Sequence, residues 1–256
     1  MTTGAPSRAL GHTIHRLGEV ASTQVEAARL AAEGATEGTV VMSTHQSAGR
    51  GRRGREWLDA PGESLLMSIV LRPRIPPNLA PQLSLVAAVA VVDALTSAGV
   101  TATIRWPNDV MVGKRKICGM LPEAVTTRDG ALGHVILGIG VNVNQCGFPA
   151  PIRTLATSMR IETGREHAVD GMLDAVLAAL EGWYPRFVEE GLGALLPAWL
   201  ERAQGIGSRA RAADGREGVA VGLAEDGALL LRMDSGESVR VVAGEVTTEV
   251  AHAAGH

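Results

Sequence analysis

Two apolar stretches separated by a proline cluster constrain the fold of this chain most. Ser64–Leu71 is apolar except for its two serines, and a short apolar run bounded by turn residues predicts a buried strand. Leu83–Ala98 carries apolar residues at helical spacing and is followed by Gly99, which predicts a helix. Apolar residues make up 46% of the chain and aromatic residues only 3%, so the core must consist mostly of Ala, Val, Leu and Ile.

Further strands and a helix are predicted on both sides of these stretches. Thr23–Glu26 fits a capping box, Ala27–Ala32 would continue the helix, and Gly34 would end it. β-rich composition, with a hairpin signal at residues 129–130, predicts strands at Ile14–Val20, Val40–Thr44, Thr101–Arg105, Lys116–Val125 and His134–Val143. Pro122 lies inside one of these strands and requires an edge position or a bulge.

The pattern changes near Gly205. Two helices are predicted before it, at Val169–Glu190 and at Leu192–Ala203, with Pro197 near the start of the second. From residue 206 onward, short strands alternate with tight-turn signals, which is typical of a small antiparallel barrel. We therefore expect a tail at residues 1–13, a catalytic domain at 14–205, a second domain at 206–250 and a tail at 251–256. The turn signals are Asp214-Gly215, Asp226-Gly227 and Ser235-Gly236.

Bulk properties exclude several classes of protein. The net charge of −3 argues against a general nucleic-acid binder. Cys118 and Cys146 are too few for a disulfide framework. Met1–Leu10 lacks the apolar core of a signal peptide, and we expect that no apolar run reaches the roughly 18–20 residues that a membrane span requires. These features predict a soluble cytoplasmic protein that binds neither membrane nor nucleic acid.

The segment Gln46–Arg55 packs three glycines and four arginines into ten residues. Glycines allow close backbone approach to a ligand, and guanidinium groups bind phosphate oxygens bidentately. The segment is not a Walker A loop, because no Lys-Ser/Thr pair follows the glycine. A polyphosphate lid, a basic nucleic-acid patch and a solvated loop all remain compatible with this segment alone.

A second group of polar residues follows the predicted strand that ends at Arg105. Asn108 and Asp109 stand in a turn after Trp-Pro, where they could face a nucleotide or could form an ordinary Asx turn. Lys116 opens the next strand, and with Lys114 it is one of only two lysines in the chain. It could project into the same site or be a solvated charge at a hairpin edge.

The third feature is a strand, Leu137–Asn144, with glycines at alternate positions. Gly138 and Gly140 lie on one face of this strand. A strand face without side chains leaves room for a ligand or for a packed helix.

Together and in this order, these three features resemble the biotin–protein ligase family over about residues 14–250. The resemblance implies an α+β fold, in which a mixed β-sheet flanked by helices, of the class II synthetase-like type, precedes an SH3-like β-barrel. It implies an ATP-dependent reaction in which biotin is activated to biotinyl-5′-AMP, with Mg²⁺, and then transferred to a lysine of a biotin carboxyl carrier protein. The oligomeric state stays open between monomer and homodimer.

The resemblance also implies roles for individual residues. Lys116, Arg50 and Arg52 would be catalytic. Arg52, Arg55, Trp57, Asn108, Asp109, Lys116 and Asn142 would bind ATP, with Trp57 covering the adenine. The biotin site would comprise Ser22, Thr23, Gln46, Gly49, Arg50, Arg52, Lys116, Gly119 and Gly138. No protein ligand of a metal ion is predicted.

Four positions depart from the family pattern, namely Gln24, Arg105, Cys118 and Pro122. Residues 1–13 are too few for the winged-helix domain of regulatory members, so we expect an enzyme-only member without operator binding. Two alternatives remain. A lipoate–protein ligase or octanoyltransferase shares the fold, but its Arg-Arg then Ser/Gly-Gly-Gly signature is not found here. A non-catalytic sensor of biotin or its adenylate would not require Lys116.

Overall fold

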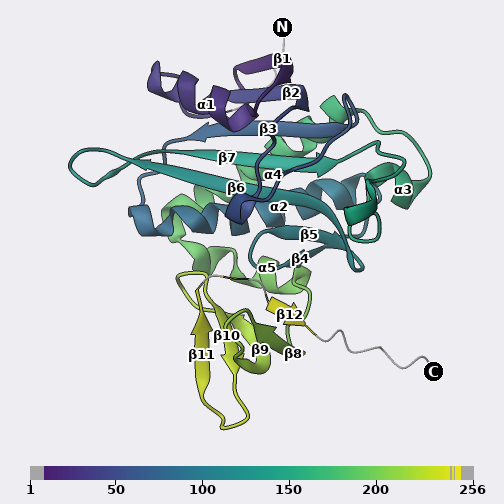
Figure 1. Ribbon diagram of the computed structural model, residues 1–256. Helices are drawn as coiled ribbons and strands as arrows, with labels where there is room; N and C mark the ends of the chain where they lie inside the picture. Colours follow the sequence, from purple (N-terminus) through teal and green to yellow (C-terminus); the bar gives the residue numbers. More distant parts are fainter. Residues whose placement is uncertain (1–8, 243, 245, 249–256) are drawn as a thin grey trace, which may run out of the picture.

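The computed structural model describes residues 9–242, 244 and 246–248 and contains two β-sheets (Figure 1). The first sheet has seven strands, and only its β1–β2 pair is parallel, so it is a mixed sheet as expected. Its spatial order is β1 (Ile14–Val20), β2 (Val40–Gln46), β3 (Ser64–Leu71), β7 (Leu132–Asn142), β6 (Arg115–Thr126), β5 (Asp109–Val112) and β4 (Thr103–Arg105).

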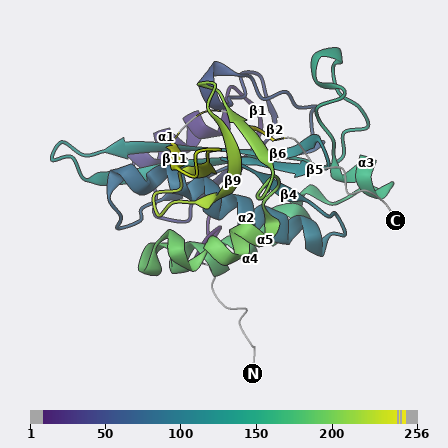
Figure 2. The ribbon, with the colours of Figure 1, turned by 90° about the horizontal axis from the view of Figure 1, so that it is seen from below.

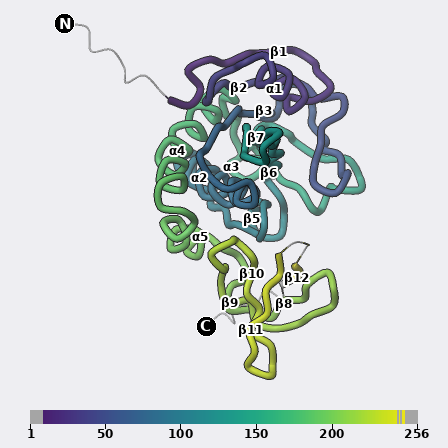
Figure 3. Tube along the Cα trace, turned by 90° about the vertical axis from the view of Figure 1, so that its left-hand side faces the viewer, coloured from purple at the N-terminus to yellow at the C-terminus, as the bar shows by residue number. Residues whose placement is uncertain are grey.

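Helices cover both faces of this sheet (Figure 3). Helix α1 (Thr23–Ala32) buries Ala27 and Ala31 against Val41 and Val70. The neighbouring strand residues, such as Ile69, face the opposite way, toward α2 (Leu83–Ser97) and α4 (Val169–Glu190). Because strand residues alternate between faces, β3 is buried along its whole length, which explains its continuous apolar run.

Helix α2 and the preceding 3₁₀ turn η2 (Pro77–Gln82) form the most apolar helical segment described. By length and composition alone, the 21-residue segment Pro77–Ser97 could cross a membrane, because an 18-residue window within it has a mean hydropathy of 1.7. The expectation that no apolar run reaches that length is therefore wrong. However, 78% of this window is buried inside the protein, between the sheet and α4. A core helix buried on all sides has the same composition.

Two local predictions need correction. The N-cap of α1 is Ser22, whose hydroxyl accepts the Gln24 N–H at 3.3 Å, so Thr23 is already helical and the capping box is wrong. The predicted helix Leu192–Ala203 is a 3₁₀ turn, η4 (Leu192–Ala194), followed by α5 (Leu196–Arg202). Proline lacks the N–H that a helix interior needs, and it fits only the first turn, so α5 begins beside Pro197. Helix α3 (Met159–Thr163) was not predicted.

Pro122 occupies a locally unpaired edge of β6, as its sequence context required. On one side Pro122 pairs with Leu137 of β7. On the other side the pairing with β5 stops at Gly119, three residues earlier, where β5 begins at Asp109. The N–H of Met120 points to that other side, toward the Asn108 carbonyl, and residues two apart share a direction. The missing N–H of Pro122 therefore interrupts no strand pairing.

The second sheet is antiparallel and lies beyond β4 and α5 (Figures 1 and 2). Positive φ angles at Gly215, Gly227 and Gly236 confirm the three predicted turns. Within the described residues the two edge strands do not pair, so the sheet is not closed into the expected barrel. Its order is β11 (Ser238–Val241), β10 (Leu229–Arg232), β9 (Glu217–Leu223), β8 (Arg209–Ala212) and β12 (Val246–Thr248).

Both ends of the chain lie partly outside the described residues. Of the predicted N-terminal tail, residues 1–8 are outside, whereas Leu10 is buried and its N–H donates to Glu181 at 3.0 Å. The predicted C-terminal tail, residues 251–256, also lies outside.

The second sheet contacts the first domain through Trp106, whose indole N–H donates to the Gly227 carbonyl at 2.9 Å.

Candidate active site

A cavity of about 840 Å³ lies where β6 and β7 meet the Gln46–Trp57 segment. We call residues 46–57 the lid. Besides the lid, the cavity is lined by the start of α1, by the turn before β5, by residues 148–156 and by the second sheet near β12. The cavity therefore gathers segments from nearly the whole chain.

The floor of the cavity is the face of β6 and β7 that carries three glycines, Gly119, Gly138 and Gly140, and the side chain of Leu121. Gly119 pairs with Gly140, and Leu121 pairs with Gly138, two residues or roughly 6.8 Å farther along the strands. A Cβ atom at Gly140 would lie 2.7 Å from Cε2 of Trp57, so the indole ring rests directly on this glycine. The two strand glycines do leave room, and side chains of the protein fill it: Trp57 lies against Gly140, and Gln24 lies against Gly138.

Lys116 stands beside the floor, at the end nearest Trp57. Its Nζ lies 2.5 Å from Oδ1 of Asp109 and 5.7 Å from the centroid of the Trp57 ring. Asp109 also accepts a hydrogen bond from Arg105 at 2.6 Å. Burial alone would raise the pKa of Asp109, but the charges and hydrogen bonds of Lys116 and Arg105 outweigh it, and the pKa lies below its usual range. Asp109 is therefore an anion that holds two cations at the site.

The opposite end of the floor is polar and closed. The side-chain oxygen of Gln46 accepts from the Thr23 backbone N–H at 2.8 Å and from the Thr23 hydroxyl at 3.1 Å. Because a backbone N–H can only donate, this contact fixes the orientation of the Gln46 amide. Gln24 donates to the Leu121 carbonyl at 3.0 Å, and its side chain lies against Gly138. Gln24, one of the four positions that depart from the family pattern, thus forms part of the cavity wall.

Side-chain contacts fasten the lid and its base. Arg52 donates to the side-chain oxygen of Asn108 at 3.0 Å, and Arg50 pairs with Glu123 at 2.7 Å. At the base of the lid, His45 contacts Asp59 at 2.8 Å. The hydrogen bond to Asp59 raises the pKa of His45, against the smaller opposing effect of burial. These contacts hold the lid closed over the floor.

The indole of Trp57 has an unsatisfied donor. Its Nε1 is buried without a hydrogen-bond partner among the described residues. A buried unpaired N–H is unfavourable, because it loses its hydrogen bond to water.

Most of the predicted site residues come together in this cavity. Twelve of them line it, whereas Ser22 and Gly49 do not. Ser22 caps α1, and the Gly49 carbonyl accepts from Trp57 N–H at 3.0 Å, so both support the site from behind. Those that line it are Thr23, Gln46, Arg50, Arg52, Arg55, Trp57, Asn108, Asp109, Lys116, Gly119, Gly138 and Asn142.

Two predicted nucleotide-side residues already have protein partners. Asn108 donates to the Met120 carbonyl at 2.6 Å, and Asn142 donates to the Thr157 carbonyl at 2.9 Å. Both side chains are buried.

The sequence interpretation missed several residues of the cavity wall. Arg105 and Lys114 flank predicted site residues, and their charge next to the Trp-Pro-Asn-Asp turn was a usable signal. The second-domain residues carried no such signal, because only tertiary packing brings them to the cavity. They are Gly244, Val246 and Thr247.

The described residues offer no protein-built metal site. No cluster of three or more His, Cys, Asp or Glu side chains occurs among them. The Mg²⁺ implied by the family would be held by the phosphates of ATP together with one or two carboxylates, as is usual for this ion. Among the cysteines, Cys118 is buried, and burial raises its thiol pKa, so it is not a nucleophile.

Comparisons with known proteins agree with this geometry. A model of the biotin/lipoate A/B protein ligase family matches residues 17–142, and one of the biotin protein ligase C-terminal domain matches residues 209–247. The biotin–[acetyl-CoA-carboxylase] ligase of Paracoccus denitrificans is 38% identical over 236 residues, covering 88% of this chain and 96% of that protein. The bifunctional ligase/repressor BirA of Bacillus subtilis is 39% identical over 223 residues, covering 85% and 68%. The biotin protein ligase of Aquifex aeolicus in complex with biotin and ATP has a TM-score of 0.79 and 28% identity, covering 93% and 99%.

Proposed function

The chain belongs to the biotin/lipoate A/B protein ligase family, and from this membership and its site we infer that it is an ATP-dependent biotin–protein ligase. The observation that supports this most is Lys116, whose ammonium lies against Gly119 of the glycine-rich floor and beside Asp109.

Lys116 is the proposed central charge of the first step. A carboxylate oxygen of biotin attacks the α-phosphorus of ATP, the bond to the β-phosphate oxygen breaks, and pyrophosphate leaves. Negative charge builds up at the α-phosphate, and a fixed cation stabilises it. Asp109 supports this role by holding the ammonium at 2.5 Å.

The closed polar end of the floor is the proposed place of the biotin ring. Its cyclic urea has two N–H donors and one carbonyl acceptor, and Thr23 and Gln46 offer hydroxyl and amide groups there. The chain of biotin would then lie along the floor, with its carboxylate at Lys116. The Trp57 ring now rests on that part of the floor, so it would rise when the acid binds and then cover the adenine.

The lid arginines are proposed to close over the adenylate. Arg50, Arg52 and Arg55 line the cavity, and Arg52 is anchored to Asn108. Exclusion of water protects the mixed anhydride from hydrolysis. The proposed roles of Asn108 and Asn142 at the nucleotide are supported by their places in the cavity wall.

The partner is the biotin carrier of a carboxylase, as the names of the relatives imply. We propose that its lysine amine enters through the mouth of the cavity and attacks the acyl carbon, so that an amide forms, AMP leaves and the amine loses a proton.

The catalytic domain is proposed to comprise residues 14–205 and the second domain residues 206–250. Two free cysteines and the use of ATP support a cytoplasmic location.

Biotin-dependent exchange of pyrophosphate into ATP tests the function directly. The purified protein should catalyse exchange with biotin and much more weakly with lipoate or octanoate. Exchange with the latter acids alone would favour the lipoate or octanoate alternative. Binding of biotin without any exchange would favour a non-catalytic sensor.

A further inference from the structure

The main chain of Lys116 is held by a segment far away in sequence. Strand β7 pairs with β6 only from Cys118 onward, and residues 155–157 take its place beside Lys116. The Lys116 N–H donates to the Leu155 carbonyl at 2.7 Å, and the Thr157 N–H donates to the Lys116 carbonyl at 2.9 Å. Both backbone groups of the proposed catalytic lysine thus depend on this segment.

The segment is itself anchored by Thr157, which is fully buried. Its carbonyl accepts the side-chain N–H of Asn142 at 2.9 Å, and its hydroxyl donates to Oε1 of Glu162. The same carboxylate accepts from Arg115, the residue before Lys116, at 2.8 Å. One carboxylate therefore binds the residue that precedes Lys116 and the residue that holds the Lys116 carbonyl.

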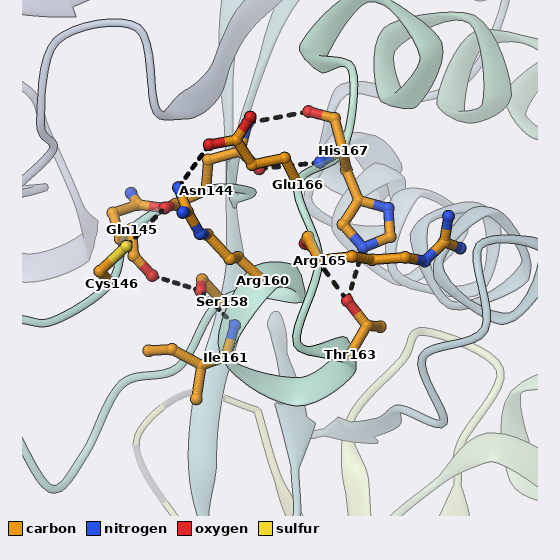
Figure 4. Close-up of polar contacts among 10 residues, drawn as sticks. All are labelled: Asn144, Gln145, Cys146, Ser158, Arg160, Ile161, Thr163, Arg165, Glu166 and His167. Carbon is orange, nitrogen blue, oxygen red and sulfur yellow. Dashed lines mark hydrogen bonds and ion pairs between the residues drawn. The ribbon is translucent and has the colours of Figure 1, made fainter.

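Short-range contacts keep Glu162 in place on α3. Ser158 caps this helix by accepting the Ile161 N–H at 3.1 Å, and its hydroxyl donates to the Gln145 carbonyl at 2.6 Å (Figure 4). This fastens α3 to the residues that follow β7. The carboxylate of Glu162 is therefore presented from a fixed helix, and its side chain is only 18% exposed.

We propose that Glu162 and Thr157 are positioning residues that set the place of the Lys116 ammonium for adenylation. Neither residue lines the cavity, so they act through Lys116 and not on the substrates. Their removal would leave the polar end of the floor intact, because Thr23 and Gln46 belong to other elements. Displacement of a reacting group by about 1 Å can lower a rate about 100-fold.

The test compares two variants with matched controls from the same region, and it rests on the proposed function. Glu162→Gln removes the charge that binds Arg115, and Thr157→Val removes the hydroxyl at nearly constant shape. Glu166→Gln is the control for charge, because the ion pair of Glu166 with Arg160, at 2.7 Å, lies on the same segment without reaching Lys116 (Figure 4).

Both variants should lower kcat for biotin-dependent pyrophosphate exchange about 10- to 100-fold, while KM for biotin and the unfolding temperature stay near those of the wild type. Glu166→Gln should leave kcat unchanged. Because Thr157 and Glu162 act in one chain of contacts, the double variant should be hardly slower than the slower single variant. Glu162→Asp, which keeps the charge, should recover part of the rate.

Three results would overturn the proposal. The first is a kcat equal to that of Glu166→Gln. The second is a lower kcat accompanied by an equal loss of biotin binding or of folded protein, which would indicate a general structural role. The third is full additivity of the two substitutions. A wild-type protein that fails to exchange with biotin would instead refute the proposed function, so the two failures are distinguishable.

Discussion

Substitution of Gly119 by alanine offers a direct test of the geometry at Lys116. A Cβ atom at this position would lie 2.8 Å from Nζ and 2.9 Å from Cε of Lys116, whereas ordinary van der Waals contact begins at 3.4 Å. To regain ordinary contact, the ammonium would have to move by about 0.6 Å, the difference between 3.4 and 2.8 Å. The same Cβ atom would lie 3.2 Å from Cζ3 of Trp57, which is also closer than ordinary contact.

The cost should appear in catalysis and not in folding. The clashing atoms are the end of a flexible side chain, so the backbone can stay where it is. A shift of this size in a charge that stabilises the transition state should lower kcat for biotin-dependent pyrophosphate exchange about 10- to 100-fold. This range corresponds to about 1.4–2.7 kcal/mol in activation free energy.

A matched control is available on β1. A Cβ atom at Gly18 would meet nothing within 4 Å, so Gly18→Ala should keep the wild-type exchange rate and slightly stabilise the strand. The unfolding temperature of both variants should be measured alongside the rate. If Gly119→Ala exchanges pyrophosphate within twofold of the wild type, the ammonium of Lys116 does not have to occupy the position described here.

Three further predictions concern Lys116, the lid and its base. Lys116→Arg should lose most of the exchange activity, because a planar guanidinium replaces a compact ammonium beside Asp109; near-normal exchange would refute the role of Lys116. Arg52→Gly removes the contact of the lid with Asn108 and should release biotinyl-5′-AMP, measured as biotinylation of bystander lysines; unchanged release would contradict the lid hypothesis. The contact of His45 with Asp59 raises the pKa of His45. The stabilisation that this contact gives to the folded state is therefore complete below the ordinary pKa of about 6.5 and is lost as the pH rises through the raised pKa. Accordingly, the unfolding temperature of His45→Gln should fall below that of the wild type most at low pH, and a pH-independent difference would contradict this assignment.

Much of the cavity lining was predictable from short segments of sequence. Alternate glycines at 138 and 140 lie on one strand face in any regular strand, and the cavity floor confirms this. The lid and Lys116 could likewise be predicted as parts of the cavity, because each prediction depends on residues that are close together in the chain. The turns of the second sheet belong to the same class, since each needs a glycine at positive φ.

Tertiary structure alone decided which groups hold the lysine and which segments close the cavity. The Lys116 backbone is bound by residues 155–157, and Trp106 reaches Gly227, 121 positions later. Tertiary structure also placed the Trp57 ring on the glycine floor and made Ser22, not Thr23, the cap of α1. Periodicity and turn preferences act between residues a few positions apart. Contacts between distant segments depend on how whole elements pack, which no single segment of sequence records.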